Sequence, residues 1–188
     1  MPTVFSHAAV GAAAASFSRL GKPPERRVVI ASALLAALPD FDGLFFGRIP
    51  YAHLFGHRGV THSLLFALVC GVTAAWLCKR SALWLHAALF TAVTASHGLL
   101  DACTSGGLGV AFFAPFDSTR YFFAHRPIPV SPMSIQGLLT ERGVRVATGE
   151  LMLLWTFAAS IWLWDRGTSW RRSAAIVCAL TGLWAWSR

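Results

Sequence analysis

The chain has 188 residues, of which 55% are hydrophobic and 13% are charged, and its formal net charge is +8. With a mean hydropathy of +0.56, this composition excludes an ordinary soluble domain and indicates a small polytopic membrane protein. In such a protein an excess of cations indicates loops that set orientation, in preference to nucleic-acid binding. The four cysteines include no C-x-x-C pair, so they do not indicate a disulfide framework.

The N-terminal part of the chain predicts two short or bent helices. Residues 4–18 are small and apolar, but fifteen helical residues span only roughly 22 Å, which is short for a full crossing of a bilayer. A basic loop over 19–27 separates them from an apolar helix that begins at residue 28. Pro39 disfavours helix at Leu38, so the acidic pair Asp40 and Asp42 is expected at a turn.

Four later stretches are strong candidates for spanning helices: 63–78, 82–100, 148–164 and 173–186. The segment 101–147 between the second and third is rich in glycine and proline, and loops of this length are usually functional. We therefore expect an all-α polytopic bundle with four strong transmembrane spans, two shorter N-terminal helices and a long outer loop region. Residues 1–188 are expected to form one membrane-embedded domain.

The distribution of cations predicts the orientation. The loops 19–27, 79–81 and 165–172 hold nine of the 16 Lys and Arg residues, whereas the longer segments 48–61 and 101–147 hold six. The loops with the higher cation density are expected on the cytoplasmic side. If the chain is threaded through the membrane in this orientation, most of the acidic residues and histidines come to the outer surface of the membrane.

The stretch SHGLLD, residues 96–101, closes an apolar run and carries two candidate metal ligands. His97 and Asp101 are four residues apart, so on a helix they share one face. An ionisable residue at membrane depth is a functional hypothesis by default. Imidazole and carboxylate together suit zinc, iron or manganese better than magnesium or calcium. Further candidates on the same expected face are His7, Asp40, Asp42, His57, His62 and Glu150.

More than four candidate ligands exceed one tetrahedral site, which indicates two or more metal ions bridged by a carboxylate. Some candidates also have structural interpretations. His7 fits an interfacial residue, and Asp40 and Asp42 can cap the turn that they occupy, so one ligand of the two is favoured over both. Glu150 fits either a ligand or base, or a carboxylate that complements a helix N-terminus.

His57 and His62 lie in the block HRGVTH, five residues apart. On a helix this spacing would point them roughly 140° apart, so both can face one site only if His57 lies in a loop. Gly59 between them fits such a loop.

At this point the motifs resemble a known family. The order PDFD, HRGVTHS, SHGLLDACTSGGLGVAFFAPFDSTRYFF, PIPVSP and then Gly-Glu-Leu at the start of a helix is similar to the YdjM-type family over residues 5–155. These are bacterial inner-membrane proteins described as metal-dependent hydrolases. The family is distantly similar to zinc-dependent phospholipase C and the fungal zinc nucleases, which are helical and cleave phosphoesters at a trinuclear zinc site.

The resemblance implies roles for particular residues. The H-x-x-x-D helix pair of those enzymes, whose carboxylate bridges metals, matches His97 and Asp101. Their H-x-x-x-E pair has no clean counterpart, because Val146 and not a histidine precedes Glu150 by four residues. This difference favours a dinuclear site. Their early histidine, aspartate and second histidine are matched in order by His7, Asp40 and His62.

The resemblance implies metal-dependent hydrolysis of a phosphoester, and the position at headgroup depth indicates a lipid or lipid-linked substrate. Zinc is the favoured metal, with iron or manganese as alternatives. Asp40 and Glu150 are expected to take part in catalysis. Arg120 and Arg126 are expected to hold the phosphate, since arginine forks match phosphate oxygens, although lipid headgroups or loop carbonyls are equally good partners for them.

Three other functions are weighed against this one. A metal transporter would need polar residues deep in several spans, yet 63–78 and 173–186 carry no charge. A scaffold with a closed structural zinc site needs only four ligands. A nuclease would need interleaved aromatic and basic residues for a strand, so nucleic acid is not an expected partner. The partners expected are the bilayer and its lipids, and the oligomeric state is left open.

Overall fold

The computed structural model describes residues 1–18, 24–78, 82–132, 134–165 and 168–187. Within these ranges the protein is all-helical, and the chain pairs elsewhere only in isolated bridges, which confirms the predicted fold class. The elements are α1 (Val4–Ala14), η1 (Ala15–Ser18), α2 (Arg26–Ala37), η2 (Leu38–Phe45), η3 (Val60–His62), α3 (Leu64–Leu77), α4 (Leu83–Ala102), α5 (Ile135–Leu138), α6 (Glu141–Glu150), η4 (Leu151–Trp155), α7 (Thr156–Asp165) and α8 (Ser169–Trp186).

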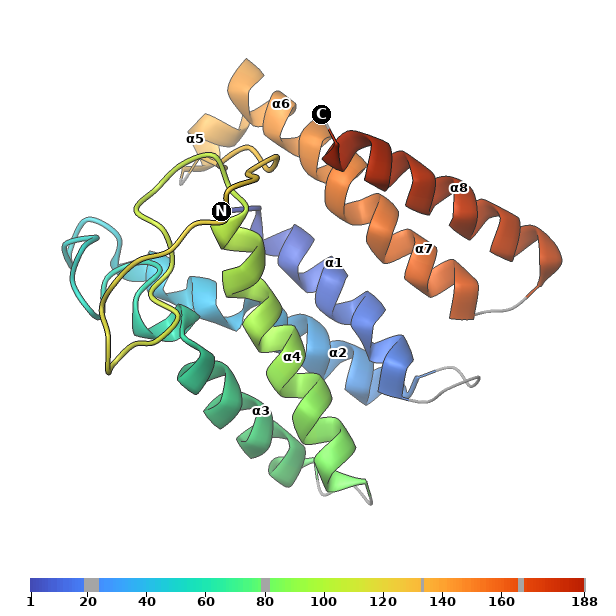
Figure 1. The fold of residues 1–188 in the computed structure, drawn as a ribbon, viewed down its shortest axis with the longest axis horizontal. Coiled ribbons are helices and arrows are strands. Elements are labelled where there is room, and N and C mark those ends of the chain that lie inside the picture. Colours follow the sequence, from blue (N-terminus) through green and yellow to red (C-terminus); the bar gives the residue numbers. More distant parts are fainter. Residues whose placement is uncertain (19–23, 79–81, 133, 166–167, 188) are drawn as a thin grey trace.

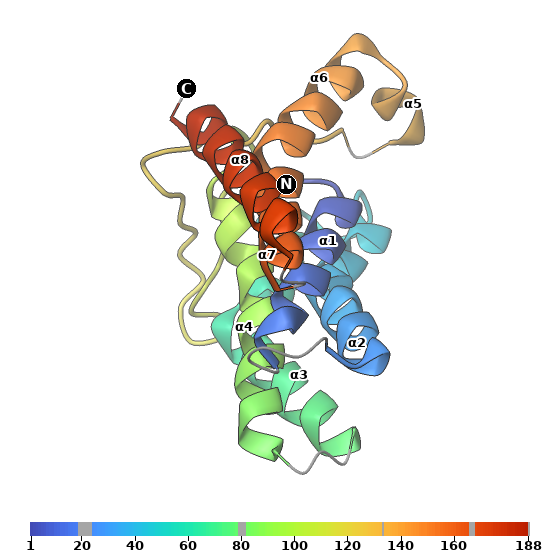
Figure 2. The same ribbon diagram turned by 90° about the vertical axis from the view of Figure 1, so that its right-hand side faces the viewer.

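Helix α4 is the centre of the bundle. It packs against α1, α2 and α3, while α7 and α8 form a hairpin whose α7 side contacts α1 (Figures 1 and 2). Small residues let these helices approach closely, as is usual between membrane helices. A Cβ atom on Gly71 of α3 would lie 2.4 Å from the backbone nitrogen of Thr91 in α4, and one on Gly11 of α1 would lie 2.4 Å from the carbonyl oxygen of Ser32 in α2.

Among the described residues, three helical stretches are long and apolar enough to cross a membrane, and not the four that the sequence predicted. They are Arg26–Phe45, Leu83–Ala102 and Glu141–Trp164. The predicted span 148–164 lies within one of them, and the predicted span 82–100 overlaps Leu83–Ala102 except at residue 82. The stretch predicted at 63–78 is a shorter apolar helix, Leu64–Leu77. The stretch predicted at 173–186 lies in α8, which is not among the described helices that are long and apolar enough to span a membrane.

Pro39 explains why a span was missed at Arg26–Phe45. It does not end the helix at a turn, because the chain continues beyond Ala37 as the 3-10 helix η2 with the proline in its first turn. Proline is tolerated there since its missing N–H has no partner to lose. Twenty helical residues then reach roughly 30 Å, the thickness of the hydrocarbon layer.

The segment 101–147 is less of a loop than the sequence predicted. Helix α4 continues to Ala102, and the amphipathic helix α6 begins after Thr140, whose hydroxyl oxygen accepts from the backbone N–H of Gly143. The chain between them folds back on the end of α4. Ser105 N–H donates to the Ile128 carbonyl (2.9 Å), and Phe123 N–H donates to the Ala102 carbonyl (3.0 Å).

The helix ends separate into two groups. In Figure 1 the end of η1, the start of α2, the end of α3 and the start of α4 lie toward one end of the molecule, together with the end of α7 and the start of α8. The start of α1, the end of α2, the end of α4 and the long irregular segments lie toward the other end. This second end carries the candidate ligands.

Candidate metal centre

Helix α4 supplies His97 and Asp101, and both side chains are fully buried on one face, as their spacing predicted. The Nδ1 of His97 lies 2.7 Å from the carbonyl oxygen of Ala36, near the end of α2. A carbonyl can only accept, so Nδ1 carries the hydrogen and Nε2 keeps its lone pair. That Nε2 lies 3.3 Å from Oδ1 of Asp40.

Helix α1 brings His7 to the same place. Its ring stacks on that of His97 with centroids 3.7 Å apart, and its Nε2 lies 3.5 Å from Oδ1 of Asp101. His7, His97 and Asp101 offer ligand atoms that all lie within 4.8 Å of one another. We call this group the helix cluster.

A second group, the loop cluster, consists of Asp40, His57 and His62, again with ligand atoms within 4.8 Å of one another. His57 lies in the loop before η3, as the block HRGVTH required. Gly59 makes this path possible, because a Cβ atom there would lie 2.1 Å from the carbonyl oxygen of Leu54. The two histidines thereby converge despite their five-residue spacing.

Asp42 orients His57 and His62 through their Nδ1 atoms. Its Oδ1 accepts from Nδ1 of His57 at 2.6 Å, and its Oδ2 lies 3.2 Å from Nδ1 of His62 and also accepts from the hydroxyl of Thr61. Histidines that bind metals commonly donate their other ring nitrogen to a carboxylate in this way. With both oxygens of Asp42 engaged, Nε2 of each histidine is left to act as a ligand.

The two clusters adjoin through Asp101. Its Oδ1 faces His7, while its Oδ2 lies 3.5 Å from Nε2 of His62, and the rings of His62 and His97 are 4.7 Å apart. A carboxylate that presents one oxygen to each group has the placement of a bridging ligand. Asp40 is shared similarly, because it belongs to the loop cluster and faces His97 of the helix cluster.

The buried atoms at this junction fit a cation. Unsatisfied polar atoms are rare in protein interiors, yet several here have no hydrogen-bond partner. Burial lowers the pKa of His62, but its contacts with Asp101 and Asp42 outweigh burial and raise the pKa to about 9, so the carboxylates favour positive charge at this position. Mixed imidazole and carboxylate donors suit zinc, iron or manganese. The atoms without a hydrogen bond are both ring nitrogens of His7, both carboxylate oxygens of Asp40 and Asp101, and Nε2 of His62 and His97. Of these, Oδ2 of Asp101 also forms an ion pair with Arg58.

Glu150 lies outside both clusters. Its Oε1 accepts from the backbone N–H of Thr3 at 2.7 Å, and its Oε2 accepts from the hydroxyls of Thr3 and Ser6. The carboxylate therefore joins the end of α6 to the first turn of α1, one residue before His7. This geometry fits the helix-terminus role that the sequence left open for Glu150, and the predicted role as a ligand or base has no support in these contacts.

The two arginines expected to hold a phosphate are placed elsewhere. Both terminal nitrogens of Arg120 donate to backbone carbonyls, including those of Tyr51 (2.8 Å) and His57 (3.0 Å), so this side chain organises the loop. Arg126 is exposed, and its guanidinium lies 4.9 Å from the ring centroid of Phe122.

Arg58 is the arginine that reaches the centre, and the sequence analysis missed it. It is 1% exposed, and its Nε lies 2.9 Å from Oδ2 of Asp101. Its terminal nitrogens donate to the Gly106 carbonyl and the Thr104 hydroxyl, each at 2.9 Å. Its place inside HRGVTH, directly after His57, was the available signal.

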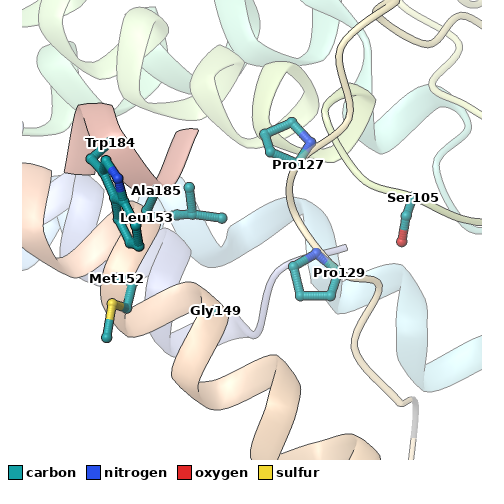
Figure 3. A pocket seen from close by; sticks show the side chains of 8 residues that line it. All are labelled: Ser105, Pro127, Pro129, Gly149, Met152, Leu153, Trp184 and Ala185. Carbon is teal, nitrogen blue, oxygen red and sulfur yellow. The ribbon is translucent and has the colours of Figure 1, made fainter. Parts of the chain in front are cut away.

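A separate hollow of about 500 Å³ lies between the 127–130 segment and the helices at the C-terminal side (Figure 3). In Figure 3 the rings of Pro127 and Pro129 stand on one side, and Met152, Leu153 and Trp184 on the other. The remaining lining residues are Ser105, Gly149 and Ala185. None of the eight is a carboxylate or an imidazole, so the metal chemistry belongs to the two clusters.

Comparison with known proteins places the whole chain among membrane proteins. A family model described as YdjM inner membrane protein matches residues 1–184. The Escherichia coli (strain K12) inner membrane protein YbcI is 38% identical over 165 residues, which cover 82% of this chain and 91% of that protein. No solved structure matches.

Proposed function

The chain belongs to the YdjM inner membrane protein family, and on that premise we propose that it is a metal-dependent hydrolase that cleaves a phosphoester of a membrane lipid or lipid-linked substrate. One observation carries the proposal. Six ligand side chains, each at most 6% exposed, meet in two clusters that adjoin through Asp101 of the helix cluster. A structural zinc site needs four ligands and is closed, so six ligands around a shared carboxylate support a pair of ions of the kind used in hydrolysis.

Each cluster would hold one ion. His7 and His97 would bind the first and His57 and His62 the second, with Asp101 between them. Zinc is the proposed metal, with iron or manganese next. Two bound divalent ions would act as Lewis acids that polarise a phosphoryl oxygen. They would also lower the pKa of a bound water molecule to about 7. Arg58 offsets the charge of Asp101 and holds its position.

The surroundings of the centre support a lipid as the source of the phosphoester. The 3-10 helix η2, which carries Asp40 and Asp42, also presents Phe41 and Leu44 with 64% and 66% of their surface exposed. Large exposed apolar residues beside a site mark contact with a membrane or another apolar partner. These exposed apolar residues support a lipid as the proposed partner, and nucleic acid is not a proposed partner.

We also propose that the centre faces the periplasm, because the described helix ends that flank the cation-dense loops lie at the opposite end of the molecule. In protein with Cys70, Cys103 and Cys178 replaced by serine, the exposed Cys78 at the end of α3 should resist an impermeant maleimide in intact cells. A cysteine at the exposed Ser118, placed in a background that also lacks Cys78, should react. The reverse labelling pattern would put the centre on the cytoplasmic side.

Hydrolysis itself is tested with purified protein that retains its metal. We expect turnover of at least one member of a panel of phospholipids and lipid-linked phosphates, loss of turnover on chelation, and recovery with zinc or manganese. His97→Ala should remove turnover, whereas His53→Ala should keep it, because His53 is exposed and outside both clusters.

A second function is favoured by a specific observation, namely that the ligand side chains are at most 6% exposed. Burial of this degree is also what a metal-binding membrane protein without turnover would show. Protein that carries its full metal content and cleaves no member of the panel would support that function in place of the hydrolase.

A further inference from the structure

We propose that a groove between α1 and α4 holds a hydrocarbon chain of the lipid whose phosphoester the metal centre cleaves; naming that lipid as the substrate rests on the proposed function. The groove has a volume of about 410 Å³, within the usual range for small-molecule sites. It is apolar apart from Ser96, whose hydroxyl donates to the carbonyl of Val93 in its own helix. Its walls include Val10 and Phe17 from the N-terminal helical segment and Leu85, Ala88, Ala92 and Ser96 from α4.

One end of the groove adjoins the helix cluster. Ser96 directly precedes His97 on α4, and Val10 follows His7 by less than one turn on α1. From Ser96 to Leu85 the groove follows α4 for roughly 16 Å. The two helices that form its walls are therefore the same two that supply the cluster's histidines (Figure 1).

The position of the groove along a membrane-spanning helix indicates that a hydrocarbon chain fills it. Its α4 wall lies within the membrane-spanning stretch Leu83–Ala102, where the surrounding solvent is hydrocarbon. Ala88 and Ala92 are exposed and small, and they leave room between the larger Leu85 and Phe17. A single lipid chain in this groove would have its headgroup end beside His7 and His97.

Under this proposal the groove would be the route by which a lipid approaches a centre whose ligands are buried. The irregular segment after α4 covers Asp101 and Arg58, with Thr104 and Gly106 bound to the guanidinium. A lipid in the groove would approach the helix cluster from the membrane side, along α1 and α4, and not through that segment.

The test uses a lipid with a photoreactive diazirine in its acyl chain, added to the metal-containing protein in nanodiscs. Cross-links mapped by mass spectrometry should concentrate on groove residues and should decrease by about tenfold in Ala88→Trp and Ala92→Trp, since added volume excludes the chain. Val72→Trp on the exposed side of α3 is the matched control and should leave groove labelling unchanged. Metal content, measured in parallel, reports whether each variant is folded.

Labelling spread evenly over α3 and the groove, or groove labelling that survives both tryptophans in protein with full metal content, would mean ordinary contact with bilayer lipid and would overturn the proposal. The readout needs no turnover, so the two proposals fail separately. Specific groove labelling in protein that cleaves no substrate would leave the lipid site standing and remove only its role in hydrolysis.

Discussion

Asp101→Asn is expected to remove nearly all bound metal, because this carboxylate presents one oxygen to each cluster. Asp42→Asn should have a smaller effect, a loss of about 10- to 100-fold in metal affinity, since Asp42 orients His57 and His62 through their Nδ1 atoms. Elemental analysis after detergent purification gives the stoichiometry, and titration of metal-free protein gives the affinities.

Asp117→Asn is the matched control for this series. Asp117 is exposed and its carboxylate accepts from the backbone N–H of Thr119, so metal content should equal that of the wild type. A second control separates loss of a ligand from loss of folding. Asp101→Asn leaves Arg58 buried without its partner, whereas Asp101→Asn combined with Arg58→Met removes that charge as well. Wild-type metal content in Asp101→Asn would rule out the bridging role.

Arg58→Ala is expected to destabilise the metal-free protein by about 3–5 kcal/mol, the usual cost of removing one partner of a buried ion pair. The loss leaves the Asp101 carboxylate uncompensated and takes the donors away from Gly106 and Thr104. Arg58→Lys should recover only part of the lost stability, since lysine keeps the charge but cannot contact Asp101, Gly106 and Thr104 at the same time, as the guanidinium does. The measurement is thermal or denaturant unfolding in detergent after chelation.

Bound metal should reduce the difference in the free energy of unfolding between Arg58→Ala and the wild type. A bound cation also offsets the charge of Asp101, and a metal ion that binds the folded protein stabilises the folded state. Arg48→Ala is the control, since Arg48 is exposed and lies in the same loop region. If metal-free Arg58→Ala unfolds at the same temperature or denaturant concentration as the metal-free wild type, the ion pair contributes nothing to stability. Arg58 is then not the residue that holds Asp101.

Local sequence determined the features that depend on short spacing. The four-residue interval between His97 and Asp101 fixes one helical face wherever α4 lies, and the all-α membrane class follows from hydropathy alone. Gly59 indicated the loop that brings His57 and His62 together, and the close approach of Leu54 at that glycine is the reason. These inferences needed no knowledge of distant contacts.

The number of long spans depended on how the chain passes Pro39, where packing of η2 beside α4 favours continuation over the turn that local preference predicts. The partners of the charged side chains were also set by the tertiary structure. Glu150 binds Thr3, 147 residues away, and Arg58 binds Asp101 while Arg120 binds loop carbonyls.

Residue type states what a side chain can donate or accept, but burial decides which of many equivalent partners it meets. Buried charges must be paired, and which pairs form depends on contacts between segments far apart in the chain. The sequence by itself therefore determined the helical membrane class and the ligand types of this protein, and only the tertiary structure decided which of those ligands share one centre.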